Sequence, residues 1–219
     1  MTQLAIDLPF RPAFGRADFL ASDCNAAALG RIDSWPDWRG RALVLYGPAG
    51  SGKSHLAQLW REKTGARLIA GEALTGQDPT ALATLPGVAV DDGERAPEQA
   101  LLHLFNCCRE TGAGLLIVAR QAPASWPIAL PDLASRLRGA DAVGIGPPHD
   151  TLLAAVLVKH FADRQLMVAP EVVAYLVPRM ERSFSSAAAL AARLDRLALS
   201  AKRAVGLALA RQALAELAG

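Results

Sequence analysis

The chain has few of the residues that mark specialised protein classes. Aromatic residues make up only 5% of its 219 residues, and its three cysteines are odd in number and lack the spacing of metal ligands. Without a secretory context, such cysteines predict reduced thiols rather than a disulfide framework. The 23 basic and 21 acidic residues nearly balance, which argues against a protein dedicated to nucleic-acid binding.

Long apolar runs are also missing. No run reaches the roughly 18 residues of a membrane-spanning helix, and the N-terminus lacks the basic-then-apolar order of a signal peptide. These absences predict a cytoplasmic protein with no membrane partner. The composition that remains, 52% hydrophobic and 20% charged, is typical of a globular protein of one or two domains.

The first two thirds of the chain alternate short apolar runs with helical periodicity. The runs at 41–46, 67–71, 87–92 and 114–119 predict buried strands, and the segments 25–32, 51–66 and 96–112 predict helices. A short helix and an edge strand are expected within 130–148. This alternation predicts an α/β fold with a parallel sheet flanked by helices on both faces.

The last third carries no strand signal. The segments 150–166, 170–180, 183–203 and 207–218 each show helical periodicity, and the proline pair at 147–148 precedes them. We therefore expect an N-terminal tail over residues 1–12, an α/β base domain over 13–148 and a small all-helical domain over 149–219.

The strongest chemical motif is "GPAGSGKS", which lies between a predicted strand and a predicted helix as a P-loop does. Its glycines let backbone N–H groups face phosphate oxygens at the positive end of the helix. Lys53 would reach the β- and γ-phosphates, and Ser54 would bind Mg²⁺. The alternative is a glycine-rich turn that only resembles the motif. The predicted phosphate-binding residues are Gly47, Pro48, Ala49, Gly50, Ser51, Gly52, Lys53 and Ser54.

The predicted strand "VAVDD" ends in two carboxylates. P-loop NTPases need an acidic residue at the end of a neighbouring strand to hold the metal. Asp91 suits that role together with Ser54, and Asp92 could orient an attacking water. A turn-forming pair of aspartates before Gly93 is the alternative.

The order of these motifs resembles the AAA+ ATPases. Within them, "GKSHLAQLW", "VAVDD" and "LPDLASRLRG" look like the DnaA/Hda family. The resemblance implies ADP or ATP with Mg²⁺, sandwiched between the base domain and a helical lid. It also implies that Phe19 and Leu20, ahead of the P-loop, wall the adenine pocket, and His55 joins this cofactor-binding set. Core packing is the alternative for Phe19 and Leu20, and packing or a solvent-exposed position on the helix is the alternative for His55.

The C-terminal region is more similar to the Hda branch of the family than to the initiators. An initiator continues into a DNA-binding domain after its lid, whereas this sequence stops at Gly219. The segment from His149 carries nine basic and six acidic side chains, too mild a surplus to replace such a domain. The resemblance implies DnaA as a partner, with DNA reached only indirectly.

The opening "MTQLAIDLPF" places apolar residues at a chain tip, where loose polar residues are usual. Hda-like proteins carry a motif here that docks on the β subunit sliding clamp of the replicase. Gln3, Leu4, Ile6 and Leu8 occupy its fixed positions, and an extended segment suits an apolar groove. A strand packed on its own domain is the alternative.

The arginine of "LASRL" acts as an arginine finger in this family, completing the nucleotide site of a neighbouring subunit. Arg136 matches it, and its guanidinium would neutralise charge on a transferred phosphoryl group. A surface pair with an acidic neighbour is the alternative for Arg136.

Two sensor regions depart from the family pattern. The polar residues that sense the γ-phosphate are replaced by Ala119 and Arg120. The sensor arginine of the lid aligns with Ser185, which leaves Arg182 as the nearby substitute. We therefore expect ADP to be the working ligand and hydrolysis by this chain to be slow.

Two questions stay open at this point. A self-sufficient P-loop ATPase, either helicase-loader-like or a small-molecule kinase, is the alternative function. The sequence also leaves open whether the chain forms homo-oligomers.

Overall fold

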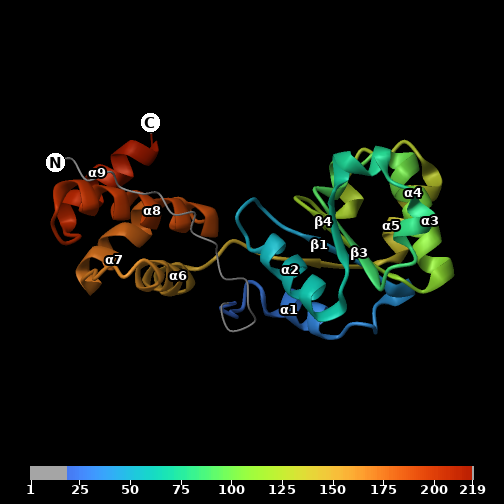
Figure 1. The fold of residues 1–219 in the computed structure, drawn as a ribbon, viewed down its shortest axis with the longest axis horizontal. Coiled ribbons are helices and arrows are strands. Elements are labelled where there is room, and N and C mark those ends of the chain that lie inside the picture. The colour runs from blue at the N-terminus through green and yellow to red at the C-terminus, as the bar shows by residue number, and fades with distance from the viewer. Residues whose placement is uncertain (1–18, 219) are drawn as a thin grey trace.

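The computed structural model describes residues 19–218. Figure 1 shows an elongated molecule in which an α/β body and a helical body are joined by an extended segment. The predicted tail over residues 1–12 lies outside the described residues.

A five-stranded parallel sheet forms the centre of the α/β body. Its strand order is β2-β3-β4-β1-β5, and every neighbouring pair is parallel. The bounds are β1 (Ala42–Tyr46), β2 (Arg67–Ala70), β3 (Gly87–Asp91), β4 (Gly114–Ala119) and β5 (Asp141–Gly144). Because β4 lies between β3 and β1, the residue that follows β4 lies between the ends of those two strands.

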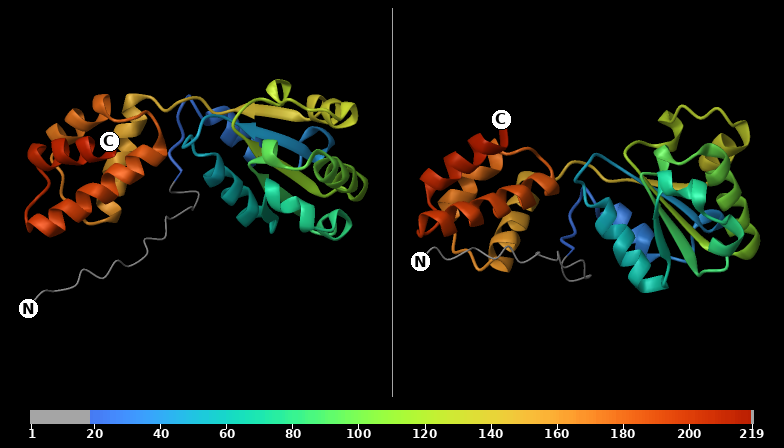
Figure 2. Two further views of the ribbon diagram at one scale, coloured as in Figure 1. Left: turned by 90° about the horizontal axis from the view of Figure 1, so that it is seen from above. Right: turned by 45° about the horizontal axis from the view of Figure 1, so that its top comes forward.

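Five helices cover the sheet. Helices lie on both faces of the sheet, as the two views of Figure 2 show. Alternate strand residues belong to two different cores, one on each face. One face is covered by α1 (Ala26–Asp33) and α2 (Lys53–Thr64), the other by α3 (Pro79–Leu82), α4 (Glu98–Thr111) and α5 (Pro131–Gly139). This arrangement confirms the predicted α/β class, and α3 is an element that the sequence analysis missed.

Tryptophans brace the face beneath α2. Trp60 is fully buried, and its ring stacks on Trp38 at 5.2 Å between centroids and meets Trp35 edge-on at 5.5 Å. Gly87 and Gly114 lie beneath Trp60 and leave no room for a side chain. Aromatic packing of this density fixes α2, and with it the P-loop at its N-terminus, against the sheet.

The helical body contains α6 (Asp150–Asp163), α7 (Pro170–Leu176), α8 (Phe184–Ala201) and α9 (Leu207–Ala218). Leucine and alanine side chains on their facing stripes form a core that shares no residue with the two cores of the α/β body. On these grounds we propose the domain boundary at residues 148/149. None of the helices within 19–218 combines the length and hydropathy needed to cross a bilayer.

Candidate functional site

The loop between β1 and α2 has the geometry of a phosphate cradle. Gly50 and Gly52 adopt φ angles of 66° and 93°, a region that L side chains rarely enter. A Cβ on Gly50 would collide with Ser185 Oγ, and one on Gly52 would lie 3.4 Å from the Phe184 ring. The loop therefore needs glycine at both positions, and it ends at Lys53, where the unpaired N–H groups of α2 begin.

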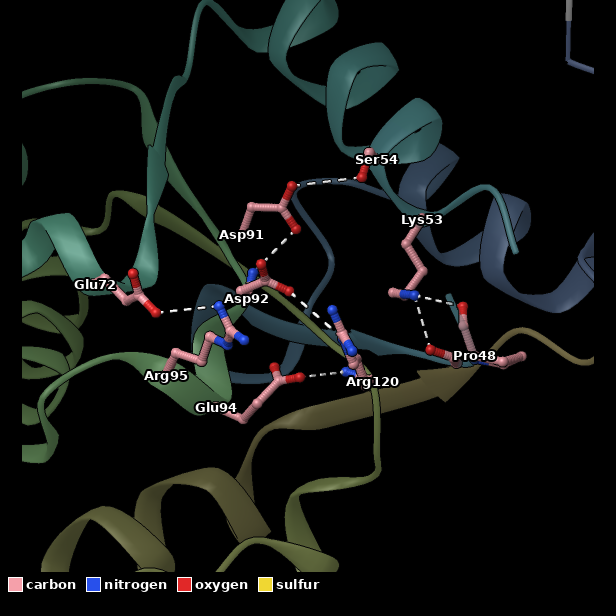
Figure 3. Close-up of polar contacts among 10 residues, drawn as sticks. Pro48, Lys53, Ser54, Glu72, Asp91, Asp92, Glu94, Arg95 and Arg120 are labelled. Atoms are coloured by element: carbon pink, nitrogen blue, oxygen red, sulfur yellow. Dashed lines mark hydrogen bonds and ion pairs between the residues drawn. The ribbon is translucent and has the colours of Figure 1, made fainter. Parts of the chain in front are cut away.

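Lys53 points back into this loop. Its Nζ donates hydrogen bonds to the carbonyl oxygens of Gly47 and Pro48, each at 2.7 Å, and the residue is only 9% exposed (Figure 3). Burial lowers the pKa of Lys53, while the carboxylates of Asp91 and Glu94 oppose that shift. The ammonium is thus a partly desolvated cation whose two acceptors are backbone carbonyl oxygens, which phosphate oxygens could replace.

The end of β3 supplies the acidic edge of the site. Ser54 Oγ donates to Asp91 Oδ2 at 3.4 Å, so the two predicted metal ligands lie together. This hydroxyl and carboxylate oxygen are the donor types that Mg²⁺ takes beside nucleotide phosphates and water. Within residues 19–218 no group of three or more His, Cys, Asp or Glu side chains is arranged so that it could hold a metal ion by itself. The donor set therefore suits a metal bound mainly through phosphate and water.

Asp92 forms a tight turn directly after β3. Its φ is 49°, and its N–H donates to Asp91 Oδ1 at 3.0 Å, so the turn-forming role considered from the sequence is present. Arg120, the first residue after β4, places its Nε 4.0 Å from Asp92 Oδ1. The Arg120 N–H donates to Glu94 Oε1 at 3.0 Å. A cation therefore stands beside the carboxylate that was expected to orient water.

A cleft of about 440 Å³ lies between the two bodies of the molecule. The predicted cofactor-binding residues Phe19, Leu20 and His55 all line this cleft, and the Phe19 and His55 rings meet edge-on at 5.3 Å. Six further lining residues come from the helical body: Val156, Lys159, His160, Phe184, Ser185 and Ala188. Of these, the sequence analysis singled out only Ser185, as the position of the family's sensor arginine. The other five lie more than 100 residues from the P-loop in sequence, and no local pattern distinguishes them from ordinary helix-packing residues.

The helical body touches the P-loop directly. The Phe184 N–H donates to the Gly50 carbonyl oxygen at 2.8 Å. The adjacent Ser183 caps α8 by accepting from the Ser186 N–H at 3.0 Å. Arg182 turns elsewhere, pairing with Asp150 at 3.0 Å, and it does not line the cleft.

The predicted arginine lies apart from the cleft on α5. Arg136 is half-buried and Arg138 exposed, and neither lines the cleft. Within residues 19–218 neither guanidinium has a hydrogen-bond or ion-pair partner. The surface pair considered for Arg136 is therefore absent from the described part of the chain. The predicted clamp-binding residues Gln3, Leu4, Ile6 and Leu8 lie outside the described residues.

Comparison with known proteins gives matches of three kinds. The family model described as "Hda, lid domain" matches residues 150–214. The chromosomal replication initiator protein DnaA of Thermomicrobium roseum is 25% identical over 216 residues, covering 88% of this chain and 46% of that protein. The chain thus spans about half the length of this curated relative.

Solved structures share the fold. Domain III of the Thermotoga maritima replication initiation protein DnaA superposes with a TM-score of 0.82 at 16% identity, covering 95% of this chain and 98% of that one. AMPPCP-bound DnaA from Aquifex aeolicus gives a TM-score of 0.70 at 17% identity, covering 86% and 66%. The helical body therefore matches the Hda lid domain, and the chain as a whole has the fold of DnaA domain III. Together with the P-loop and the parallel sheet, these findings support an AAA+ protein related to DnaA and Hda.

Proposed function

We propose that this protein is a nucleotide-bound regulator of DNA replication initiation, which binds the β sliding clamp and promotes ATP hydrolysis by the initiator DnaA. The observation that carries the proposal is the separation of two features. The cleft is equipped to hold a nucleotide, whereas Arg136 stands outside it with no partner in the described chain. An arginine so placed suits the nucleotide site of another subunit.

The proposed ligand is ADP or ATP with Mg²⁺, and ADP is the working form. Gly47–Ser54 would hold the phosphates, Ser54 and Asp91 the metal, and Phe19, Leu20 and His55 the base. The metal would neutralise phosphate charge when bound. The Arg120 guanidinium, 4.0 Å from Asp92, supports slow hydrolysis in this chain, because a carboxylate oxygen that faces a cation is less available to orient an attacking water.

The proposed clamp contact is made by Gln3, Leu4, Ile6 and Leu8. It places the protein in the cytoplasm at clamps loaded on DNA, so that DNA is reached only through the clamp. Self-association is compatible with this arrangement.

The experiment is a reconstituted assay of DnaA ATP hydrolysis with DNA-loaded clamp. The full chain should stimulate hydrolysis, and a chain lacking residues 1–10 should neither bind the clamp nor stimulate, while its melting temperature stays within about a degree of the parent. Stimulation that persists without the clamp or without residues 1–10 contradicts the tethering part of the proposal. A large drop in melting temperature instead supports packing of the tail on its own domain.

A second candidate, a self-sufficient P-loop ATPase, is favoured by one observation. Lys53, Ser54 and Asp91 are all present and close together, so one chain carries the side chains needed to bind both the phosphates and the metal. ATP turnover by the isolated chain, measured without clamp or DnaA, separates the two candidates, since sustained turnover at about 1 s⁻¹ or more, the lower end of typical enzyme values, supports the second.

A further inference from the structure

The segment between β4 and α5 is held at both ends by carboxylates from one short stretch of chain. Glu94 accepts the Arg120 N–H at 3.0 Å. Glu98, the first residue of α4, accepts the Ala129 N–H at 2.9 Å with one carboxylate oxygen and the Leu130 N–H at 2.7 Å with the other. Glu94 and Glu98 lie two and six residues after Asp92, which ends the acidic turn.

The Glu98 contact lies where α5 begins. Leu130 is the N-cap residue of α5 and offers no side-chain cap, and Pro131 follows as its first residue. The backbone of the cap residue is instead fixed from outside the helix, by a charged and bidentate acceptor. Hydrogen bonds of that kind are among the stronger ones in proteins.

The body of the helix is held by apolar contacts. Leu133 and Leu137 are each 1% exposed and belong to the core shared with α4. Arg136 lies between them on the helix, so the direction of its side chain depends on both the apolar seat and the fixed start of the helix. Leu133 thus anchors the first turn of α5 to the core, and Glu98 holds the backbone immediately before that turn.

The segment also closes on the acidic turn. Trp126 Nε1 donates to the Gln121 carbonyl oxygen at 2.9 Å, and a Cβ on Gly93 would lie 3.6 Å from the Trp126 ring. Trp126, in the segment that leads into α5, therefore lies beside Gly93, the residue that follows the acidic turn.

We propose that Glu98 is the positioning residue for Arg136, fixing the start of α5 so that the arginine is presented to the nucleotide of a neighbouring subunit. This inference rests on the proposed function of Arg136. Glu98 does not touch the nucleotide cleft and acts only through the backbone of residues 129 and 130.

The test uses Glu98→Ala, Glu98→Gln and the matched control Glu110→Gln, which removes the same charge from the exposed far end of α4. Amide exchange at Ala129 and Leu130 should rise about 10- to 100-fold in Glu98→Ala, as expected for the loss of hydrogen bonds to a charged acceptor. The glutamine variant keeps one acceptor oxygen and should show a smaller rise. Glu110→Gln should leave both amides unchanged.

Function is read in the reconstituted DnaA assay with all three variants and with Arg136→Ala. Glu98→Ala should lower maximal stimulation about 10- to 100-fold, the order expected for a misplaced catalytic group, while ADP affinity stays within twofold. Full stimulation by Glu98→Ala despite faster exchange overturns the inference, and so does an equal loss of ADP affinity and stimulation. If Arg136→Ala also stimulates fully, the proposed function fails as well.

Discussion

The nucleotide cleft and helix α5, which carries Arg136, differ in how many of their polar side chains have hydrogen-bond or ion-pair partners in the same chain. In the cleft, Lys53, Ser54 and the Gly50 carbonyl all have partners from the same chain, drawn from both bodies of the molecule. On α5 the backbone is firmly held, but Arg136 and Arg138 have no partner within residues 19–218. These polar groups of the cleft are therefore paired within the chain, whereas the two cations of α5 are unpaired in the described residues, as the proposed role of Arg136 in another subunit requires.

The largest effect on this difference between the cleft and α5 is expected from substitutions of Arg136. Arg136→Ala should lower stimulation of DnaA by about 10³- to 10⁵-fold, because a missing arginine finger leaves charge on the transferred phosphoryl group uncompensated. Arg136→Lys should also fail, since an ammonium cannot reproduce the forked contact. Nucleotide and clamp binding should be unchanged in both variants.

Arg138→Ala is the matched control on the same helix, because it removes an exposed guanidinium two residues further along α5. Stimulation should stay within a few-fold of the parent. Equal losses from the two alanine variants would mean that α5 supplies only general positive charge.

Lys53→Ala tests the cleft side of the comparison. With ADP at about a hundred times the dissociation constant, binding should stabilise the parent by roughly 2.7 kcal/mol, and the variant should show none of this gain. Thermal unfolding with and without ADP measures it. Lys63→Ala, at the exposed far end of α2, should keep the full gain, and a Lys53→Ala protein stabilised like the parent would refute the assignment of the P-loop.

Gly50→Ala sharpens the role of the contact between the lid and the P-loop. The substitution forces an alanine to φ 66° and against Ser185, which should cost about 1–2 kcal/mol of unfolding free energy and weaken ADP binding. Gly76→Ala is the control, because a Cβ there has open space around it. Urea denaturation that ranks the two variants as equally stable would show that the lid does not press on the loop.

The smallest effect is expected from Arg182→Ala. Its ion pair with Asp150 is exposed, at 64% and 48% for the two side chains, so its loss should cost at most about 1 kcal/mol. ADP affinity should stay within twofold. A tenfold loss of ADP affinity would mean that Arg182 leaves Asp150 to contact the nucleotide. It would then replace the sensor arginine, whose position in the lid Ser185 occupies.

Sequence patterns predicted the parts of the molecule that local chemistry determines. Apolar runs marked the strands, and the glycines with Lys53 and Ser54 marked the cradle, because each signal lies within a few consecutive residues. The departure at Arg120 was also visible from the sequence, but only as a lost sensor. The structure adds that its guanidinium faces Asp92, which depends on β4 lying between β3 and β1.

The remaining features arise from contacts between distant segments. Phe184 and Val156 have the periodicity of core residues, so nothing in the sequence sets them in the cleft wall. Glu98 has the sequence character of an ordinary acidic residue in the first turn of a helix, and its two backbone partners lie about thirty residues away. α3 is only four residues long, too short for periodicity to reveal.

The separate core of the lid has a consequence for unfolding. A helical body that shares no buried residue with the sheet can open on its own, so the free protein is expected to lose structure in two steps under denaturant. A nucleotide that touches Phe19 and Lys53 on one side and Val156 and Phe184 on the other would cross-link the two folding units. Ligand binding would thereby convert two independent transitions into one cooperative transition, and the nucleotide would become a structural part of the native state.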